Sequence, residues 1–155
     1  MMENFVRESN KIEGIMRDPT PHEIEAHIDF VSLTEVTPET LAVFVSVIQP
    51  DAVLRDRVGL NVQVGSYIPP AGGPHIVTML QELLDRGSAL HPRNETKAYN
   101  QHIGYEKLHP FTDGNGRSGR ALWLWHMHKN GMGRRALYLG FLHNFYYQTL
   151  GAGGK

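Results

Sequence analysis

The feature that most constrains this chain is a twelve-residue stretch, HPFTDGNGRSGR, which runs from His109 to Arg120. Pro110 disfavours a helical conformation for the residue before it, so a preceding helix is expected to end near His109. Gly114 and Gly116 let the backbone turn so that consecutive N–H groups point inward, and such a concave backbone binds anions. The pattern therefore predicts a tight loop that leads directly into a second helix.

The helix expected from about Asn115 carries two cations beside its own N-terminus. The first turn of a helix has free N–H groups and the positive end of the helix dipole. Arg117 and Arg120 lie one turn apart there, although a cation at this end is unfavourable by about 0.3 to 1 kcal/mol. Two such cations indicate that an anion regularly binds, and a polyphosphate fits this arrangement best.

Two further side chains of the stretch indicate chemistry at the phosphates. Asp113 offers a hard oxygen ligand to Mg²⁺, which keeps most of its waters and takes its remaining ligands from the nucleotide. His109, with an ordinary pKa of about 6.5, is largely neutral at pH 7 and is able to accept the proton of an attacking hydroxyl. The stretch therefore predicts a phosphate site with a general base beside it.

Two other interpretations of the stretch are weaker. The letters GNGRSG match G-x-G-x-x-G, but a dinucleotide-binding turn needs a strand before it and an acid about 20 residues later. The preceding AYNQHIGYEKLH has a helical pattern, and no Asp or Glu follows Asp113. The other interpretation, a glycine-rich loop with an incidental His109, explains single residues but not the whole string.

The stretch matches the motif H-x-F-x-[DE]-G-N-G-R-x-x-R at every fixed position, and the chain therefore resembles the Fic (Fic/Doc) family. The resemblance implies an all-α fold with one small β-hairpin, a flap that holds the target segment, and transfer of AMP from ATP to a protein hydroxyl. It implies that His109 is the general base and that Asp113 binds magnesium. It assigns nucleotide binding to a wider set, which is Phe111, Gly114, Asn115, Gly116, Arg117 and Arg120, with Arg120 at the γ-phosphate.

Length and composition limit the class of protein further. A chain of 155 residues without cysteine is expected to form a single domain over residues 1–155, without disulfides or thiolate chemistry. The N-terminus lacks an apolar signal core and no apolar run reaches membrane-spanning length, so a cytoplasmic protein without membrane partners is expected. The net charge of −1 argues against nucleic-acid binding.

The small net charge hides an uneven distribution. Residues 1–113 carry all 16 acids and nine of the 15 basic residues, a balance of −7, whereas residues 114–155 carry six basic residues and no acid. A basic surface patch would explain this difference. A field that attracts ATP explains it equally well, because two of the six basic residues lie in the motif.

The segment from about Glu3 to Met16 is expected to form a helix, and Gly14 and then Pro19 mark its end. Its expected buried side consists of Phe5, Ser9, Ile12 and Met16. Ser9 and Glu13 stand at i and i+4, so they lie close together on a helix surface. The letters SNKIEG resemble the inhibitory motif [ST]-x-x-x-E-[GN] of the family branch that carries its inhibitor at the N-terminus. The resemblance implies that residues 1–16 form an inhibitory helix, whose Glu13 accepts a bidentate pair of hydrogen bonds from Arg120.

Capping patterns mark two more helices. Thr20-Pro21-His22-Glu23 is a capping box, and Thr37-Pro38-Glu39 is a second start. Helical spacing predicts their buried faces, which are Ile24, Ile28 and Val31 in the first helix and Leu41, Phe44, Val45 and Ile48 in the second. His22 and His27 are expected to face solvent or to fill polar corners. Further helices are expected over HIVTMLQELLDR, from a cap at Asn94 to His109, from Asn115 to Gly131, and over ALYLGFLHNFYYQTL.

The strand-like part of the chain is VGLNVQVGS, from Val58 to Ser66, in which apolar and polar residues alternate. An isolated hairpin is marginal in water, so a lone pair of short strands in a helical chain is better suited to docking than to a core. The segment resembles the Fic flap and is assigned to residues 57–70. There Val62, Gln63 and Val64 are expected to pair with an extended target segment. The alternative is an ordinary loop.

Together the patterns predict a protein adenylyltransferase that transfers AMP from ATP, with Mg²⁺ or Mn²⁺, to a Ser, Thr or Tyr hydroxyl of a target protein. Self-modification and a homo-oligomer are compatible with this prediction. The related Doc branch, which phosphorylates, has a lysine where Gly116 stands, so glycine favours nucleotidyl transfer. The alternatives are removal of AMP with Glu13 orienting a water, transfer from another donor such as UTP or CDP-choline, and a non-catalytic nucleotide-binding module. The intact His109 and Asp113 argue against the last.

Overall fold

The computed structural model describes residues 1–88 and 95–153, and in these ranges the chain forms eight helices and no strand. The helices are α1 (Met2–Ile12), α2 (Pro21–Val31), α3 (Pro38–Ile48), α4 (Pro74–Ser88), α5 (Glu95–Leu108), α6 (Asn115–Lys129), α7 (Gly133–Leu139) and α8 (Phe141–Gly153). The predicted all-α class is confirmed. No helix within the described ranges has the length and apolar character needed to cross a membrane.

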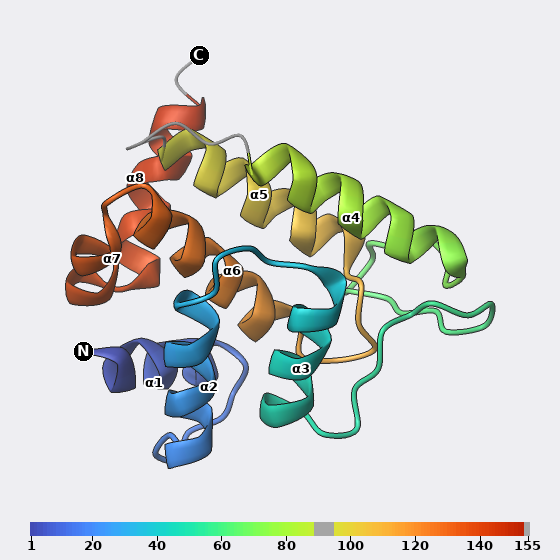
Figure 1. Cartoon of the computed structure of the whole chain (residues 1–155), viewed down its shortest axis with the longest axis horizontal. Coiled ribbons are helices and arrows are strands. Elements are labelled where there is room, and N and C mark those ends of the chain that lie inside the picture. Colours follow the sequence, from blue (N-terminus) through green and yellow to red (C-terminus); the bar gives the residue numbers. More distant parts are fainter. Residues whose placement is uncertain (89–94, 154–155) are drawn as a thin grey trace.

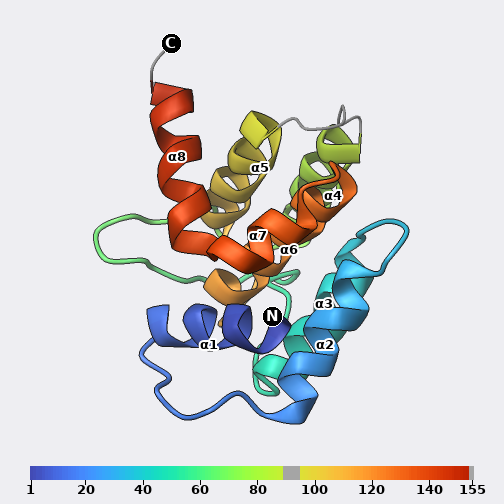
Figure 2. The same ribbon diagram turned by 90° about the vertical axis from the view of Figure 1, so that its left-hand side faces the viewer.

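Helix α6 is the centre of the fold, with α4 and α5 on one side and α1, α2 and α3 on the other (Figure 1 and Figure 2). It contacts α1, α2, α3, α5 and α7. Every residue from Ala121 to Met127 is buried, because a helix enclosed by other helices has no side that faces solvent.

Two hydrophobic clusters share α6 and fix its position. The larger contains Leu122 and Trp125 and joins residues of α2, α3, α4 and α5. The smaller contains Trp123 and Met127 and joins residues of α1, α7 and α8. Because full burial of one large apolar side chain is worth about 1.5 to 3 kcal/mol, the two clusters hold α6 firmly. The first turn of α6, which belongs to the motif, is anchored with it.

The predicted capping box at Thr20 is present, and the predicted helix start at Thr37 has one as well. The Thr20 side chain accepts a hydrogen bond from the Glu23 backbone N–H, and the Glu23 carboxylate accepts one from the Thr20 backbone N–H. Thr37 forms the equivalent pair with Thr40 at the start of α3. The predicted buried face of α3 is confirmed, since Leu41, Phe44, Val45 and Ile48 are all buried.

The prediction for the buried side of α2 was partly wrong. Ile28 is 48% exposed, whereas His27 is 1% exposed and packs edge-on against the rings of Phe5 and Phe44. Burial lowers the pKa of His27 to about 4, so the ring is neutral and fills the core as an aromatic group. Helical spacing favoured the side with Ile24 and Ile28, because the side that is buried carries the polar residues Glu23 and His27.

The N-terminal helix is shorter than predicted, because it ends at Ile12 and not at Met16. Glu13 is its C-cap, and Gly14 follows with a φ of 79°, a left-handed conformation that glycine adopts without strain. Phe5 and Ser9 are buried as predicted, but Ile12 and Met16 are exposed. Glu13 therefore projects from the end of α1 and not from its side.

The predicted β-hairpin of residues 57–70 is instead a loop with one isolated β-bridge. The bridge pairs Val64 with Tyr67 through two backbone hydrogen bonds of 2.9 Å. Gly65, between them, has a φ of 59° and makes the turn. The described residues contain no second strand with which the alternating segment could pair. Because a short isolated strand is marginally stable in water, the segment forms a loop. The loop projects from the body of the molecule beyond α3 and α4 (Figure 1).

The C-terminal segment forms two helices where one was predicted. Gly140 separates α7 from α8 and has a φ of 85°. Phe141 is buried, and Leu137 and Phe145 pack against the same hydrophobic cluster. The predicted cap at Asn94 lies outside the described residues.

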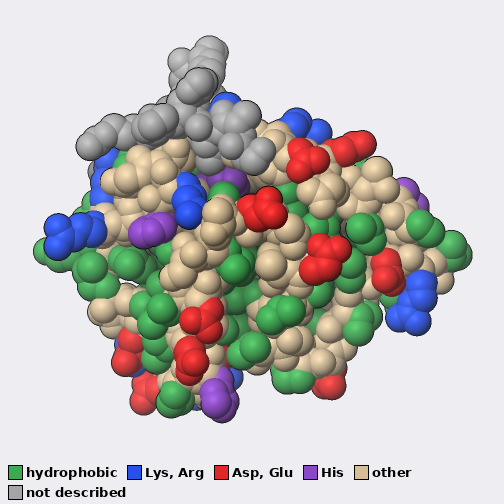
Figure 3. Space-filling view, viewed as in Figure 1, with side chains coloured by type: hydrophobic (Ala, Val, Ile, Leu, Met, Phe, Trp, Pro, Cys, Tyr) green, Lys and Arg blue, Asp and Glu red, His purple; other side chains and the backbone are tan. Residues whose placement is uncertain are grey.

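The charged side chains are spread over the surface that Figure 3 displays. On the described part of that face, acidic side chains lie scattered among hydrophobic ones, and Lys and Arg lie mostly toward the edges (Figure 3). The acidic side chains visible on this face, which all belong to residues 1–113, therefore form no single patch.

Candidate active site

The motif lies in a cleft of about 940 Å³ between the end of α1, the flap loop (residues 57–70) and the start of α6. The residues assigned from the sequence that line the cleft are His109, Asp113, Gly114, Asn115, Gly116, Arg117, Arg120, Glu13, Val62, Gln63 and Val64. Ser9 and Phe111 are not among its lining residues. The fold thus brings together three segments that are far apart in the sequence.

His109 leaves α5 with a φ of 51°, and it is the one non-glycine residue of the described ranges in the left-handed region. Its Nδ1 lies 3.1 Å from the Glu106 carbonyl oxygen. A carbonyl only accepts, so Nδ1 donates and Nε2 keeps the lone pair. Partial burial lowers the pKa of His109 below its ordinary value, and the nearby Arg55 charge adds to this effect. The imidazole is therefore neutral at pH 7 with Nε2 able to accept a proton.

Asn115 closes the loop between His109 and α6. Its side-chain Nδ2 donates to the Phe111 carbonyl oxygen (2.7 Å), and its Oδ1 accepts from the Phe111 N–H (2.9 Å). The Phe111 ring is buried in the core, so it packs beneath the loop and does not face the cleft. Gly114, the N-cap of α6, has a φ of 76°. These contacts shape the turn and leave the first N–H groups of α6 as its anion-binding groups.

Asp113 is exposed at the mouth of the loop, and its Oδ1 accepts a hydrogen bond from the Gly114 N–H (2.8 Å). The described residues contain no group of three acids or histidines placed to hold a metal ion together. A magnesium ion at Asp113 would therefore take its other ligands from water and nucleotide phosphates. This is the usual coordination of Mg²⁺, and Asp113 fits it.

Arg117 and Arg120 differ more than the sequence indicated. Arg117 is buried and reaches the C-terminal end of α3, where its Nη1 donates to the Ile48 carbonyl oxygen (3.0 Å) and its Nη2 to Gln49 Oε1 (2.7 Å). Burial lowers the pKa of Arg117. Its charge complements the negative end of the α3 dipole. The side chain of Arg117 thus joins α6 to α3, and its backbone N–H remains part of the loop.

Arg120 binds both residues that the inhibitory pattern singled out. Its Nε donates to Ser9 Oγ (2.7 Å), and its Nη2 donates to the Ser9 carbonyl oxygen (2.9 Å) and to Glu13 Oε2 (2.6 Å). The predicted partners meet, but Glu13 accepts one hydrogen bond and not a bidentate pair. The reason is that Glu13 approaches from the end of α1, while Ser9 binds Nε and shares Nη2 with Glu13.

Gly116 leaves the space that this contact needs. A Cβ atom at Gly116 would lie 3.0 Å from the Glu13 carboxyl carbon and 3.2 Å from Arg120 Nη1. Both distances are shorter than ordinary contacts, so any larger residue there would press on the ion pair. Glycine at position 116 is therefore what allows the Glu13 carboxylate to lie against the start of α6.

Helix α1 is built into the core as well as reaching the cleft. Phe5 and Val6 are 1% and 0% exposed, and Phe5 stacks parallel to Trp123 at a centroid distance of 6.3 Å. The carboxylate of Glu8 accepts a hydrogen bond from the Phe141 N–H (2.6 Å) at the start of α8. The end of α1 is thus held at the cleft by packing that does not involve Arg120.

Sequence reasoning missed two residues at the site. Glu106 lines the cleft, and its Oε1 is buried without a hydrogen-bond partner among the described residues. Burial raises the pKa of Glu106 to about 7, although the Arg120 charge opposes the shift. Arg55 lies behind the cleft and is completely buried. No local pattern marks either residue, because their neighbours come from distant segments.

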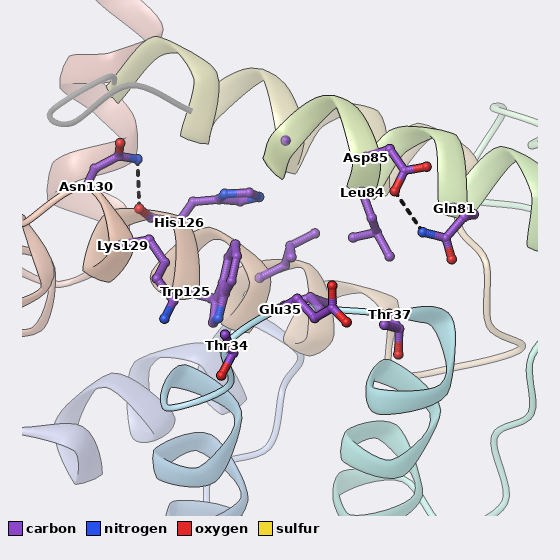
Figure 4. A pocket seen from close by; sticks show the side chains of 13 residues that line it. Thr34, Glu35, Thr37, Gln81, Leu84, Asp85, Trp125, His126, Lys129 and Asn130 are labelled. Carbon is purple, nitrogen blue, oxygen red and sulfur yellow. Dashed lines mark hydrogen bonds between the residues drawn. The ribbon is translucent and has the colours of Figure 1, made fainter. Parts of the chain in front are cut away.

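A second cavity of about 300 Å³ lies away from the motif, between the α2–α3 connection, α4 and α6 (Figure 4). Trp125 stands on its wall and donates to the Leu33 carbonyl oxygen (2.9 Å). His126 also stands there, but both ring nitrogens are buried and lack partners in the described part of the chain. Burial lowers the pKa of His126 to about 4, so the ring is neutral. Because its nitrogens are covered, His126 presents no polar group to this cavity.

The family model described as "Fic/DOC family" matches residues 48–127 of the chain. The matched region runs from the last residue of α3 through most of α6, so it contains the flap loop and the whole motif. Helix α1, with Ser9 and Glu13, lies outside it. No curated protein matches this chain.

Proposed function

Because this chain belongs to the Fic/DOC family, we propose that it transfers AMP from Mg·ATP to a Ser, Thr or Tyr hydroxyl of a protein. One observation carries the proposal: a single cleft gathers the imidazole of His109, the carboxylate of Asp113 and the first turn of α6. These are a base, a metal ligand and an anion-binding backbone, and nucleotidyl transfer uses all three together.

The triphosphate of ATP is assigned to the N-terminal turn of α6. The backbone from Gly114 to Arg117 offers N–H groups there, and the helix dipole favours an anion. Arg120, one turn further along, is the cation proposed for the γ-phosphate. A divalent ion at Asp113 would offset charge on the phosphates, and Mn²⁺ suits the same oxygen ligand as Mg²⁺.

In the proposed transfer, Nε2 of His109 accepts the proton of the target hydroxyl. The hydroxyl oxygen then forms a bond to the α-phosphorus, and the bond from that phosphorus to the bridging oxygen of the β-phosphate breaks. The products are an AMP ester of the target and pyrophosphate. The neutral state of His109, which follows from its lowered pKa, suits this role at pH 7.

The target segment is assigned to the flap loop, which forms one wall of the cleft. Val62, Gln63 and Val64 line the cleft together with residues of the motif. An extended peptide that pairs with exposed backbone gains hydrogen bonds that hardly depend on its sequence. In this way the loop would fix the register of the target hydroxyl relative to His109.

Glu13 is proposed to restrain the enzyme by occupying Arg120. The carboxylate binds the same guanidinium that would hold the γ-phosphate, and charge-assisted hydrogen bonds of this kind are strong. ATP would still bind through the loop but with its phosphates displaced. A misplacement of about 1 Å at the reacting atoms can cost on the order of 10²-fold in rate.

The test is an intact-mass measurement of the purified protein, and of candidate target proteins, after incubation with Mg·ATP. The proposal expects a mass increase of one AMP moiety, faster in Glu13→Gly than in the wild type and absent in His109→Ala. Parallel incubations with UTP and CDP-choline identify the preferred donor. An enzyme that binds nucleotide but modifies nothing, even as Glu13→Gly, would be a binding module.

A second experiment separates transfer from removal of AMP. Glu13 lines the cleft together with His109, so it stands where a carboxylate could orient a hydrolytic water. Incubation of the wild type and Glu13→Gly with an AMP-modified target decides the matter. Release of AMP that requires Glu13, without any forward transfer, would replace the proposed reaction with hydrolysis.

A further inference from the structure

Arg55 is buried without an acidic partner, which is unusual for a guanidinium. Its side chain is 0% exposed, and none of the ion pairs formed by the described residues includes it. Burial lowers the pKa of Arg55. A buried charge is costly unless every donor finds an acceptor, so the contacts of this side chain explain why the fold tolerates it.

The acceptors of Arg55 are four backbone carbonyl oxygens from two segments. Nε donates to His109 (2.7 Å) and Nη2 to Leu108 (2.9 Å). Nη1 donates to Leu60 (3.1 Å) and Pro70 (2.8 Å). One planar group therefore joins the two ends of the flap loop to the turn that carries His109.

The backbone on either side of Arg55 runs along the same turn. The Arg55 N–H donates to the Pro110 carbonyl oxygen (2.8 Å), and the Thr112 N–H donates to Val53 (2.9 Å). An isolated bridge pairs Leu54 with Phe111. The segment that precedes the flap loop is thus paired with the loop after His109, and the Arg55 guanidinium adds hydrogen bonds to Leu60 and Pro70 within the flap loop.

The position of His109 needs such support. A non-glycine residue in the left-handed region is strained and persists only where its surroundings fix it. Arg55 binds the carbonyl of this very residue. An apolar side chain of similar volume would fill the space without a desolvation cost, but it would not supply the fixed fork of donors.

We propose that Arg55 is a positioning residue that couples the flap loop to the base, so that docking of the target and placement of the His109 imidazole occur as one arrangement. This inference rests on the proposed function, because the target is the substrate of the transfer. Arg55 itself touches neither nucleotide nor target, and it acts through the backbone of His109.

The first test compares Arg55→Lys and Arg55→Met with Tyr67→Phe, all in the Glu13→Gly background. Tyr67 also joins the flap loop to the end of α5, since its hydroxyl donates to the Lys107 carbonyl oxygen (2.7 Å), but it does not bind His109. Both Arg55 variants should bind ATP with unchanged affinity and lose about 10- to 100-fold in kcat for target modification. Tyr67→Phe should raise KM for the target and leave kcat nearly unchanged.

The second test uses the pH dependence of kcat/KM. A general loss of structure would not shift this pH profile in the neutral Arg55→Met variant while leaving it unshifted in the charged Arg55→Lys variant. Burial lowers the pKa of His109, the Arg55 charge lowers it further, and Glu13 and Asp113 raise it. Removing the positive charge in Arg55→Met should raise the pKa of His109, so the acidic limb of the profile moves to higher pH. Arg55→Lys keeps a positive charge, so its limb should stay near that of the parent.

The results test the positioning role of Arg55 and the proposed function independently. A folded Arg55→Lys with the kcat and KM of its parent overturns the positioning role, and so does an equal loss of kcat in Tyr67→Phe. An NMR titration of the His109 ring needs no substrate, and identical spectra in all variants would also overturn it. If no protein is modified but the His109 signals change with Arg55, the proposed function fails while the coupling stands.

Discussion

Nη2 of Arg120 lies 2.6 Å from Oε2 of Glu13, and this contact joins the end of α1 to the first turns of α6 across 107 positions of sequence. The Glu13 side chain is 37% exposed, whereas the Arg120 side chain is 6% exposed. The carboxylate is therefore the partner that is free to move, while packing and Ser9 hold the guanidinium. A phosphate that reached Arg120 would displace Glu13 and leave the arginine in place.

Replacement of Glu13 by glycine should raise self-modification by at least ~10-fold, which corresponds to about 1.4 kcal/mol in the barrier. The reason is that the Nη2 group of Arg120 loses its acidic partner and becomes available to the γ-phosphate. The rate is measured from the AMP-bearing fraction in intact-mass spectra over time. A Glu13→Gln variant, which keeps the shape but not the charge, should fall between the wild type and glycine.

Two control variants test whether activation by Glu13→Gly results from the release of Arg120. Ser9→Ala removes the hydroxyl that binds Nε of Arg120 but leaves Glu13 in place, so it should activate much less. Glu13→Gly combined with Arg120→Ala should lose the gain, because relief is useful only if the arginine holds a phosphate. Equal rates for wild type and Glu13→Gly, with transfer detectable in both, would refute self-inhibition.

The burial of α1 predicts a stability effect that is independent of the cleft. Phe5→Ala should lower the free energy of unfolding by about 3 to 5 kcal/mol, because it leaves a cavity beside Trp123. Ile12→Ala, on the same helix but 42% exposed, should change it by no more than about 0.5 kcal/mol. Chemical denaturation measures both. For the same reason, deletion of residues 1–16 would expose core side chains and is a poor substitute for Glu13→Gly.

Replacement of His109 by alanine should reduce transfer by about 10² to 10⁴-fold, the usual contribution of a positioned general base. ATP affinity should stay nearly unchanged, because the imidazole acts on the attacking hydroxyl. Calorimetry with ATP and the transfer assay measure the two properties separately. Parallel loss of ATP binding and transfer would instead place His109 at the donor.

Replacement of Asp113 by alanine should abolish transfer with every divalent ion, because the described residues contain no group of three metal-binding side chains that could hold the ion in its place. The wild type should respond to Mg²⁺ or Mn²⁺ and lose activity in excess chelator. The same variant tests the fold, since Asp113 accepts only one local hydrogen bond and its loss should leave thermal unfolding little changed. Full activity in chelator would remove Asp113 from the mechanism.

The parts of the fold that were predictable depend on neighbours in sequence. Thr20 and Thr37 cap their helices through residues three positions away, and Pro110 acts on the residue directly before it. The contact between Glu13 and Arg120 was predicted only from the resemblance to the family's inhibitory motif, because no local rule links residues that far apart in the sequence. It holds in the structure with a different geometry, since Gly14 ends α1 earlier than helical spacing indicated.

The features that escaped prediction depend on contacts between distant segments. Arg117 resembles Arg120 in the sequence, but the carbonyl of Ile48 at the end of α3 lies within its reach. Arg55 shows no local sign of burial, because its acceptors belong to residues on two separate turns. The flap loop alternates like a strand, but strand pairing depends on a partner that the surrounding chain does not supply.

The flap loop offers a test of target docking with a matched control. Val62→Pro should spare ATP binding but depress modification of protein targets, because proline removes a backbone donor from the wall of the cleft. Val58→Pro lies in the same loop, is 87% exposed and does not line the cleft. It falls inside a turn closed by a hydrogen bond from the Leu60 N–H to Arg57 (3.2 Å), at the position that proline favours.

The two proline variants should therefore differ in one property, the KM for protein targets. Both should unfold at temperatures close to that of the wild type, since neither Val58 nor Val62 belongs to a core cluster. Val62→Pro should raise KM by about 10-fold or more, which corresponds to about 1.4 kcal/mol of docking energy, whereas Val58→Pro should keep it. Equal KM values for the two would mean that the loop only covers the cleft and that the target binds elsewhere.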